Sequence, residues 1–436
     1  MKTLHITASY KPAFIYGGPI YSVATLCEEL CKVESQQSMD NGQWTMDDKR
    51  KSKVFVTVYT TLANGDIELP YSSGKTETVD SVSVTYFKRI TKDHSHFSPA
   101  LLMHLWKNVK KFDVIHIHSW WNLVSMGAVI VCLCRGVKPI VSPRGMLGDY
   151  TMSKGKSLFH RLVGKQLLKR CNFHATTAME AKEIAQRVFD GKVEVVDLME
   201  EKSKKGEVKS KKNKEQGTKR KEQRVENSLK GTPSPSERAG VRLFIIHNLV
   251  KLPEKLPLRA RVFDGTLNLI FLSRIHHKKG IELLLDALAL VDFPFRLSIV
   301  GEGEPDYAEN LKRKAVSEKL DGYINWVGAV YGDEKYQLLA DHDAFILPSY
   351  NENFANVVIE AIAVGTPVLL SEHVGLQDYV KANQYGLVFK LDELKSSLDN
   401  AYRLFSGGRL SIDRMGLIDN GSLTDKYLEM YNECFL

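Results

Sequence analysis

Short apolar runs alternate along the chain with longer segments in which apolar residues recur every three or four positions. Short runs of this kind are typical of buried strands, and the longer periodicity is typical of amphipathic helices. Their regular succession predicts βαβ units on a parallel sheet. In the first half we expect a helix at 20–32 and strands at 3–7, 54–59, 82–87, 113–118, 139–142 and 173–176.

A second alternating series begins at Leu243 with FIIHN and continues through LNLIFLSR, FRLSIVGEG, YINWVG, DAFILPS, TPVLLS and GLVF. The 436 residues exceed what one ordinary core accommodates. We therefore predict an α/β protein of two doubly wound, Rossmann-like domains that face each other across a cleft. The first domain is expected at 1–190 and the second at 243–415.

Residues 191–242 are expected to form a charged, disordered insert or linker. Within it, residues 200–238 hold thirteen Lys or Arg against seven Asp or Glu, which is most of the net charge of +8. Few aromatic or β-branched residues occur there, so the segment cannot bury enough surface to fold. Its lysines could contact anionic lipid or nucleic acid. A solvated loop is the simpler interpretation, and no nucleic-acid partner is expected.

The composition is that of a soluble globular protein, with 43% hydrophobic and 26% charged residues. The opening sequence MKTLHITASY has no long apolar core, so we interpret it as a strand rather than a secretory signal. The longest apolar helical run, 123–134, is too short to span a bilayer. The six cysteines form no C-x-x-C pair and no cluster with metal-ligand spacing, which favours a reduced, cytoplasmic setting.

Two carboxylates stand out in residues 346–370, ILPSYNENFANVVIEAIAVGTPVLL. Glu352 falls in a polar turn after a predicted strand, where open α/β sheets bind their ligands. Taken alone, a Glu before a helix is more often a solvated charge favoured by the helix dipole. Glu360 lies inside the apolar helix VVIEAIA and needs a bonding partner, because burying an unpaired carboxylate is costly.

The start of that helix predicts an anion site. The amides of Phe354, Ala355 and Asn356 would be its unpaired donors. Arg274 and Lys279, in the segment SRIHHKKG after another strand, would meet a diphosphate from the opposite side. Each cation in isolation would be an ordinary surface charge. Together with the two acids, they suit a sugar joined to a diphosphate.

The first domain offers weaker signals. Gly17-Gly18 after the first strand would let backbone approach a ligand, although a plain tight turn fits equally well. The strand DVIHIH puts His116 and His118 on one face, either reaching the cleft or forming a satisfied interior pair. Arg144 follows another strand in SPRGML, where an arginine can clamp phosphate or carboxylate but is more often a surface charge.

Four segments together resemble one known family. Gly17-Gly18-Pro19, SPRGML, SRIHHKKG and SYNENFANVVIEAIAVGTPV are similar to the signatures of retaining GT-B glycosyltransferases of family 4, in particular bacterial enzymes of capsule, exopolysaccharide or lipopolysaccharide assembly. The resemblance covers nearly the whole chain apart from about residues 190–242. The specific part is R-x4-K-G followed by E-x7-E, since either motif alone is weak.

The resemblance implies a transferase that moves a hexose or related sugar, with retention, from a nucleoside diphosphate to a glycan or lipid-linked acceptor. In such enzymes Arg274 and Lys279 would hold the donor diphosphate. Glu360 would bind the ribose hydroxyls and Glu352 the hydroxyls of the transferred sugar. His118 would lie near the reacting sugar.

The remaining implied roles concern the walls of the cleft. The Gly17-Gly18 loop would close over the diphosphate, and Asn353 with the following three residues would bind the donor. Arg144 would lie on the acceptor side, and the helix within 416–436 would cross back onto the first domain. Acceptors of this class sit at the inner face of the plasma membrane, so a cytoplasmic enzyme with peripheral membrane contact is expected.

The family generally needs no metal ion or other cofactor, the nucleoside-diphosphate sugar being a substrate. Two cations and the helix amides can offset the charge that grows on the leaving diphosphate. No further carboxylate is placed as a nucleophile. We therefore expect front-face displacement in which the leaving phosphate accepts the acceptor's proton, and a trapped glycosyl-enzyme would overturn this mechanism.

Three departures from the family pattern favour a rival interpretation, a non-catalytic GT-B-like scaffold subunit of a polysaccharide assembly complex. The insert interrupts the region just before the interdomain linker, where domain closure would hinge. Ala355 stands where many relatives have glycine, and a negative φ there would make the change harmless. His247-Asn248-Leu249 replaces the usual P-N-G turn. The presence of Arg274 and the other three charged residues favours the enzyme.

Overall fold

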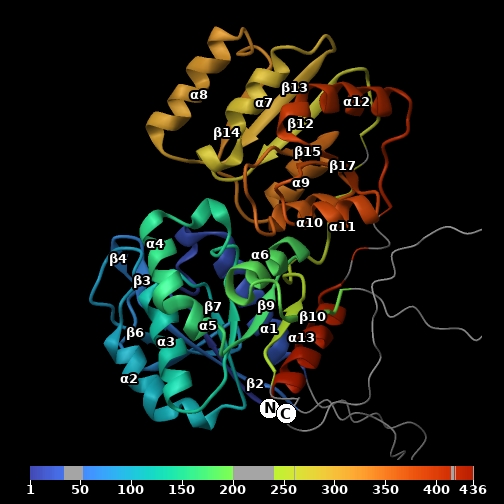
Figure 1. Cartoon of the computed structure of the whole chain (residues 1–436). Helices are drawn as coiled ribbons and strands as arrows, with labels where there is room; N and C mark the ends of the chain where they lie inside the picture. Colours follow the sequence, from blue (N-terminus) through green and yellow to red (C-terminus); the bar gives the residue numbers. More distant parts are fainter. Residues whose placement is uncertain (34–52, 200–239, 260, 414–416, 418, 436) are drawn as a thin grey trace, which may run out of the picture.

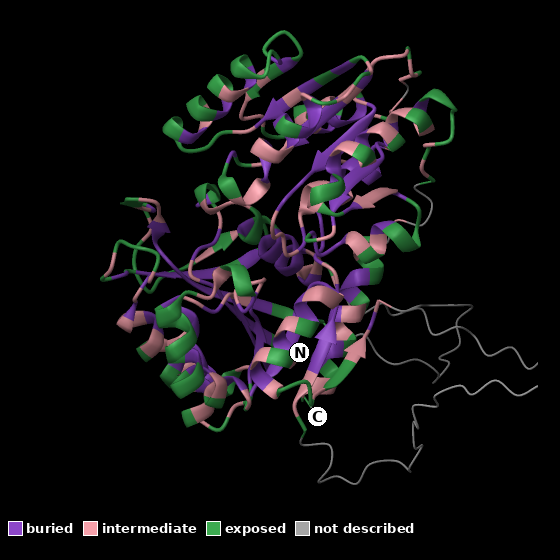
Figure 2. Ribbon diagram, turned by 45° about the horizontal axis from the view of Figure 1, so that its top comes forward, coloured by how far each residue is buried: buried purple, intermediate pink, exposed green. Residues whose placement is uncertain are grey.

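The computed structural model describes all residues except 34–52, 200–239, 260, 414–416, 418 and 436. Two α/β domains stack on each other, with the N-terminal half of the chain in one and the yellow-to-orange part in the other (Figure 1). The predicted α/β class with two doubly wound, Rossmann-like domains is confirmed. Each domain is organised around its own sheet, and buried residues run through the centre of both (Figure 2).

The N-terminal domain holds a nine-stranded sheet in the order β10-β11-β9-β8-β7-β1-β2-β6-β5. Its pairings are parallel except that β5 runs antiparallel to β6. The strands are β1 (Lys2–Ile6), β2 (Phe55–Thr61), β5 (Thr76–Val79), β6 (Val82–Phe87), β7 (Val114–His118), β8 (Ile140–Ser142), β9 (Asn172–Ala175), β10 (Glu194–Asp197) and β11 (Arg242–Ile245). A two-stranded ribbon, β3 (Ala63–Asn64) with β4 (Ile67–Glu68), lies beside it.

Helices cover both faces of this sheet, because its strands are apolar on both sides. One core contains α1 and α13 side chains, and the other contains side chains of α2, α3 and α6. The N-terminal helices are α1 (Gly18–Cys31), α2 (Pro99–Asn108), α3 (Leu123–Cys134), α4 (Lys154–Phe159), α5 (Lys165–Leu168) and α6 (Ala178–Phe189). The hydroxyl of Thr177 caps α6 by accepting from Glu180 N.

The C-terminal domain is a six-stranded parallel sheet in the order β14-β13-β12-β15-β16-β17, the doubly wound order of a dinucleotide-binding fold. The strands are β12 (Leu267–Leu272), β13 (Phe295–Val300), β14 (Ile324–Gly328), β15 (Ala344–Leu347), β16 (Val368–Ser371) and β17 (Gly386–Phe389). The helices are α7 (Ile281–Leu288), α8 (Pro305–Ser317), α9 (Glu334–Ala340), α10 (Asn356–Ala363), α11 (Gln377–Ala382) and α12 (Leu394–Ser406).

The expected boundary between the domains was wrong. We placed residues 191–242 in an insert and began the second domain at 243, but β10 and β11 belong to the N-terminal sheet. β11 pairs in parallel with β9 and β10, and Phe244 is buried in the same core as α1. An apolar run in the sequence shows a strand but not which sheet receives it. The predicted disordered segment 200–238 lies outside the described residues.

The chain crosses between the domains twice. After β11 it passes to the C-terminal domain, and it returns before α13 (Asn420–Phe435). Asn420 joins the two crossings by hydrogen bonds: its side chain donates to Val250 O (3.0 Å) and accepts from Val250 N (3.2 Å). The structure places α13 against α1 and β7 of the N-terminal domain. No helix among the described residues is both long and apolar enough to cross a bilayer.

Candidate active site

The turn between β15 and α10 carries Glu352. Its backbone is fixed against the segment after β16, because Glu352 N donates to His373 O (2.9 Å) and Glu352 O accepts from Gly375 N (2.8 Å). These bonds hold the turn at the carboxyl end of the sheet, the edge at which such folds bind ligands.

Lys279 lies beside this turn and forms an ion pair with Glu352, and both side chains are largely buried. The segment 274–280 follows β12, and a left-handed Gly280 (φ 67°) ends its single helical turn. A Cβ at Gly280 would lie 2.2 Å from Pro348 O, so the two segments approach too closely for any side chain there. The chain thereby brings the lysine of one predicted motif to the acid of the other.

The charges around Glu352 keep it ionised. Burial alone would raise its pKa, but the charge and hydrogen bond of Lys279 and the charges of Lys278 and Arg274 outweigh burial and lower it. Arg274 itself is exposed. Lys278, Lys279 and Arg274 thus lie with one carboxylate at one end of the sheet, and we call these three residues the cation cluster. Their positive charge exceeds the charge of the carboxylate, so it is available to an anion.

Glu360 has the partner that its buried position demanded. Lys335 on α9 donates to its carboxylate at 2.7 Å. Tyr21 on α1 lies close enough for the charge of Glu360 to act on it, together with Tyr331, although burial is the main reason that the pKa of Tyr21 is raised. Glu360 therefore faces the first turns of α1 in the other domain.

Gly17 and Gly18 lie where α1 begins. Gly17 adopts φ 74° and precedes the helix, and Gly18 is its first residue. A Cβ at either glycine would meet no atom within 4 Å, so open space adjoins this backbone. The positive φ of Gly17 accounts for one glycine of the pair, and the space beside both is compatible with the expected approach to a ligand.

Ala355 does not satisfy the condition that would have made it harmless. It adopts φ 63° and ψ 80° as the residue preceding α10. An L-residue is strained in this left-handed region, by roughly 1 kcal/mol or more. The alanine thus carries a cost that the glycine of the family pattern would avoid.

The side chains of Asn353 and Phe354 are engaged elsewhere, so their predicted role in binding the donor would fall to the backbone. Asn353 Nδ2 donates across the domain interface to Thr176 Oγ1 (2.8 Å) and Glu180 Oε2 (3.2 Å). Phe354 is buried against the ring of His247, with 5.5 Å between centroids. Only their backbone, with that of Asn356, remains available for the predicted anion cradle.

His118 belongs to a fully buried group of histidines rather than to an open wall. Its ring nitrogens lie 3.1 Å from His5 Nδ1 and 3.3 Å from Arg144. His116 is bonded to Tyr431 of α13 (2.9 Å) and to Ser142 (2.6 Å). The interior alternative for this pair therefore describes both histidines, and His118 is buried next to Arg144.

Desolvation is the main cause that lowers the pKa of His5, His116 and His118 and of the neighbouring His174. The positive charge of Arg144 lowers these pKa values further. The pKa values of His5 and His174 fall to about 3. Nitrogens of His5, His116 and His118 lie within 4.8 Å of one another, a spacing that a metal ion could use. The adjacent guanidinium cation opposes a second positive charge there.

Arg144 follows β8 in a loop, as predicted, and its guanidinium is hydrogen-bonded within the protein. It donates to Ser22 Oγ and Asn248 Oδ1, both at 3.0 Å, and its Nε is buried without a partner among the described residues. Its pKa is lowered by burial. Arg144 therefore ties α1 to the segment after β11 and supports His118.

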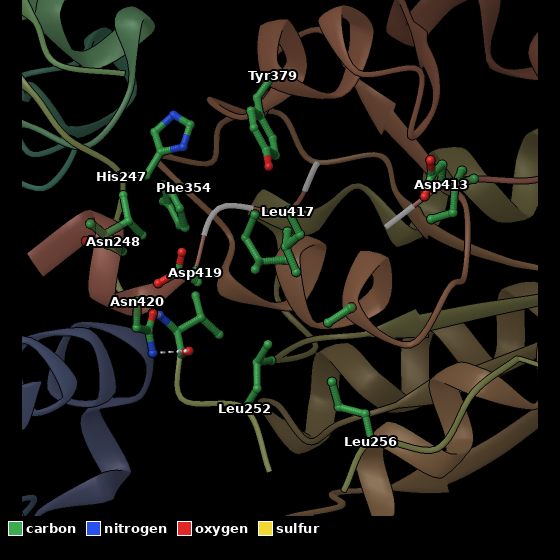
Figure 3. Close-up of a pocket in the computed structure, with 15 residues that line it drawn as sticks. His247, Asn248, Leu252, Leu256, Phe354, Tyr379, Asp413, Leu417, Asp419 and Asn420 are labelled. Carbon is green, nitrogen blue, oxygen red and sulfur yellow. Dashed lines mark hydrogen bonds between the residues drawn. The ribbon is translucent and has the colours of Figure 1, made fainter. Parts of the chain in front are cut away.

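A pocket of about 630 Å³ lies beside the turn between β15 and α10, which we call the donor turn (Figure 3). His247, Phe354 and Tyr379 line one part of it, and residues of α10, α13 and both chain crossings line the rest. Its lining includes none of the four predicted charged residues and no lysine or arginine. A diphosphate requires such cations or free amides, so we assign this pocket to the junction between the crossings. His247-Asn248-Leu249, the turn that departs from the family pattern, lies there.

Several residues that shape the cleft gave no interpretable signal in the sequence. Glu180 is buried and accepts from Gly145 N (2.7 Å), Thr176 N (2.8 Å) and Asn353. Lys335 pairs with Glu360 from another helix. Only a three-dimensional contact shows either role, although the demand of Glu360 for a partner could have prompted a search for a lysine.

Known proteins resemble both parts of the chain. Residues 259–407 match the family model "Glycosyl transferases group 1". The D-inositol 3-phosphate glycosyltransferase of Pseudarthrobacter chlorophenolicus is 31% identical over 132 residues, 29% of this chain and 31% of that protein. The lipopolysaccharide core biosynthesis glycosyltransferase LpsE of Rhizobium meliloti is 26% identical over 167 residues, 36% of this chain and 48% of that protein. The alignments thus span about a third to a half of these relatives.

The likeness in structure extends over both domains. HepE from Anabaena, solved in complex with UDP and glucose, superposes with a TM-score of 0.59 at 13% identity, covering 99% of both chains. At this identity the likeness concerns the fold. The chain has the two-domain GT-B fold of solved glycosyltransferases, and its C-terminal domain matches glycosyl transferases group 1.

Proposed function

We propose that this protein is a metal-independent, retaining glycosyltransferase of family 4. It transfers a sugar from a nucleoside diphosphate to a glycan or lipid-linked acceptor in cell-surface polysaccharide synthesis. The supporting observation is the Lys279–Glu352 ion pair with Arg274 beside it, at the ligand-binding edge of the sheet in the domain that matches glycosyl transferases group 1.

Without a donor, Lys279 pairs with Glu352 and Lys335 pairs with Glu360, while Arg274 is exposed. An incoming diphosphate offers Lys279 and Arg274 a more highly charged partner than a carboxylate. Glu352 is then released to accept hydrogen bonds from hydroxyls of the transferred sugar. Glu360 exchanges part of its bonding with Lys335 for the ribose hydroxyls in the same way. Substrate hydroxyls replace the lost charge partners, so neither acid is left unpaired.

In the chemical step the bond between the anomeric carbon and the diphosphate oxygen breaks as the acceptor oxygen approaches from the same face. The electron pair leaves with the diphosphate, and its oxygen takes the acceptor's proton. Lys279, Arg274 and the amides before α10 stabilise the charge that develops on the leaving group. No side chain forms a covalent intermediate.

The test uses a panel of nucleoside-diphosphate sugars. A true donor should raise the melting temperature by mass action, and slow donor hydrolysis should release free sugar. Glu352→Gln should abolish hydrolysis while the protein stays folded. Transfer with inversion at the anomeric carbon, or a glycosyl-enzyme adduct trapped on any residue, would contradict the proposed mechanism.

The non-catalytic scaffold is the second candidate, and two observations favour it. Ala355 is strained at the donor turn, and Asn353 bonds to the N-terminal domain. A scaffold would show neither donor-induced stabilisation nor hydrolysis with any nucleotide sugar. Stabilisation by one donor that is then hydrolysed excludes it.

A further inference from the structure

The carboxylate of Glu180 lies where the two domains meet, at the start of α6 (Figure 1). Glu180 is only 1% exposed, and its hydrogen-bond donors are all neutral groups. Oε1 accepts from Gly145 N (2.7 Å), and Oε2 accepts from Thr176 N (2.8 Å), Thr176 Oγ1 (2.9 Å) and Asn353 Nδ2 (3.2 Å). Such bonds offset the cost of burying the carboxylate. We call these four residues the interdomain clasp.

A capping role accounts for only part of these bonds. A glutamate in the first turn of a helix ordinarily reaches back and satisfies a free amide just before the helix. The two bonds from Thr176 serve this purpose, because they fix the turn that leads into α6. The bond from Gly145 comes from the loop after β8, and the bond from Asn353 comes from the other domain. Glu180 therefore does more than cap its own helix.

Glycines let the two domains approach closely on both sides of the clasp. A Cβ at Gly145, which has φ 73°, would lie 2.8 Å from Asn353 Cβ. A Cβ at Gly375 in the C-terminal domain would lie 1.9 Å from Asn353 O and 2.9 Å from Thr177 Oγ1. Neither position has room for a side chain. The hydrogen bond from Asn353 to Glu180 is thus part of a close-packed junction between the domains.

The clasp adjoins the candidate site on both sides of the cleft. Asn353 directly follows Glu352 in the donor turn. Gly145 directly follows Arg144, which lies beside the buried histidines. A single peptide unit therefore separates the clasp from Glu352 on one side and from Arg144 on the other. Because one carboxylate holds both segments, it fixes the position of each relative to the other.

We propose that Glu180 is a positioning residue that holds the two sides of the cleft at a fixed distance. It holds Glu352 through Asn353, and it holds Arg144 through Gly145. Without this carboxylate, the donor turn would lose its anchor on the N-terminal domain. The consequence for catalysis rests on the proposed glycosyltransferase function, whereas the positioning itself does not.

Hydrogen–deuterium exchange of the full chain tests the positioning. In Glu180→Ala, peptides that cover 143–151 and 350–356 should exchange about tenfold faster than in wild type, because each segment loses a bond that opposes local opening. Ser98→Ala is the matched control, since Ser98 is also buried and caps α2 with bonds inside the N-terminal domain. It should leave both peptides at the wild-type rate. Wild-type exchange at 350–356 in Glu180→Ala would reduce Glu180 to a helix cap and overturn the proposal.

Substitutions on the other side of the contact decide the question even if Glu180→Ala does not fold. Asn353→Asp places a second carboxylate against Glu180, so peptide 350–356 should exchange at least about tenfold faster than in wild type. Glu180→Gln/Asn353→Asp exchanges the places of the donor and the acceptor. Its exchange should return to within about threefold of wild type, because the two sites are coupled. A double variant that exchanges as fast as Asn353→Asp alone would overturn the proposal.

Kinetics separate positioning from donor binding. In Glu180→Gln, the affinity for a free nucleoside diphosphate should stay within about threefold of wild type, because the cation cluster is intact. The turnover of donor hydrolysis should fall about tenfold, because the two sides of the cleft are no longer held in register. An equal loss of both quantities would contradict the positioning role. If wild type hydrolyses no donor, the proposed function fails, and the exchange measurements still decide the positioning.

Discussion

The cleft has an N-terminal wall and a C-terminal wall, one from each domain. The two walls hold their polar residues in different ways. On the N-terminal side, His5, His116 and His118 are fully buried, and burial keeps their pKa values low enough to leave them neutral. On the C-terminal side, Lys279 and Glu352 are charged and paired at the sheet edge. The first wall is a closed scaffold completed by α13, and the second can exchange partners with a ligand.

Under the proposed function, this difference explains why the residues expected to contact a donor lie almost entirely in one domain. Buried neutral groups that already bond to one another lose bonds if a ligand displaces them. Paired charges at an open edge can instead accept a diphosphate without leaving a group unpaired. Substitutions on the C-terminal wall should therefore affect activity, and those on the N-terminal wall should affect stability.

Lys279→Met should have the largest effect. It removes a cation from the leaving diphosphate, and losing one such preorganised donor costs about 10²–10³-fold in turnover. Steady-state donor hydrolysis measures the loss. Lys314→Met is the matched control, because Lys314 pairs with Asp286 on neighbouring helices away from the cleft. Equal loss in both variants would show that the comparison of the two walls is mistaken.

Acidification should act on the N-terminal wall. Unfolded histidine titrates near pH 6.5, whereas the folded pKa values of His5 and His174 are about 3. Between these values the unfolded chain binds more protons, so the free energy of unfolding decreases as the pH falls. Each such histidine contributes up to about 1.4 kcal/mol per pH unit. Urea unfolding at pH 7 and pH 5 should show this decrease.

The matched variants for that experiment are His5→Gln and His94→Gln. His5→Gln removes one low-pKa group, so unfolding should depend less steeply on pH even if the variant is weaker at pH 7. His94 is exposed, and its substitution should leave the slope unchanged. An unchanged slope in His5→Gln would mean that the buried cluster does not remain neutral.

The sequence predicts the C-terminal wall well because its chemistry follows from local order. R-x4-K-G and E-x7-E each follow a strand, and parallel strands deliver their ends to one edge, so Lys279 and Glu352 had to meet. The burial of Glu360 predicted that it has a bonding partner. The sequence spacing did not indicate that this partner is Lys335 of α9. The N-terminal wall was harder, because His116 bonds to Tyr431 of α13, over 300 residues away.

The interface between the walls was not predictable. Asn353 belongs to the donor motif, yet its side chain bonds to Thr176 and Glu180 in the other domain. Such a contact depends on how two rigid bodies approach each other, which no local pattern encodes. The same limit explains the misplaced domain boundary, since FIIHN could join either sheet until its neighbours were known.

Asn353→Ala should have an intermediate effect. It removes the hydrogen bonds that hold the donor turn to the N-terminal domain, and one such bond contributes about 1 kcal/mol. Catalytic efficiency should fall by roughly tenfold while the melting temperature changes little, because both cores remain intact. Asn383→Ala is the control, since the side chain of Asn383 donates to Tyr379 O within its own domain. A large drop in melting temperature would instead make Asn353 a stabilising residue.

Ala355→Gly should have the smallest effect and the opposite sign. Glycine relieves the φ of 63° but gains freedom in the unfolded chain, so the free energy of unfolding should rise by at most about 1 kcal/mol. Ala308→Gly, inside α8, should lower it by about 0.5–1 kcal/mol. Chemical denaturation distinguishes the two. Destabilisation by Ala355→Gly would show that the turn does not strain its alanine.

The exchange of partners at the Lys279–Glu352 pair is tested most directly by calorimetric titration of a free nucleoside diphosphate. We expect Lys279→Met to weaken binding at least about 10²-fold. Glu352→Gln should bind the diphosphate as tightly as wild type or more tightly, because the competing carboxylate is gone. Wild-type affinity in Lys279→Met, or weak binding in Glu352→Gln, would contradict the account.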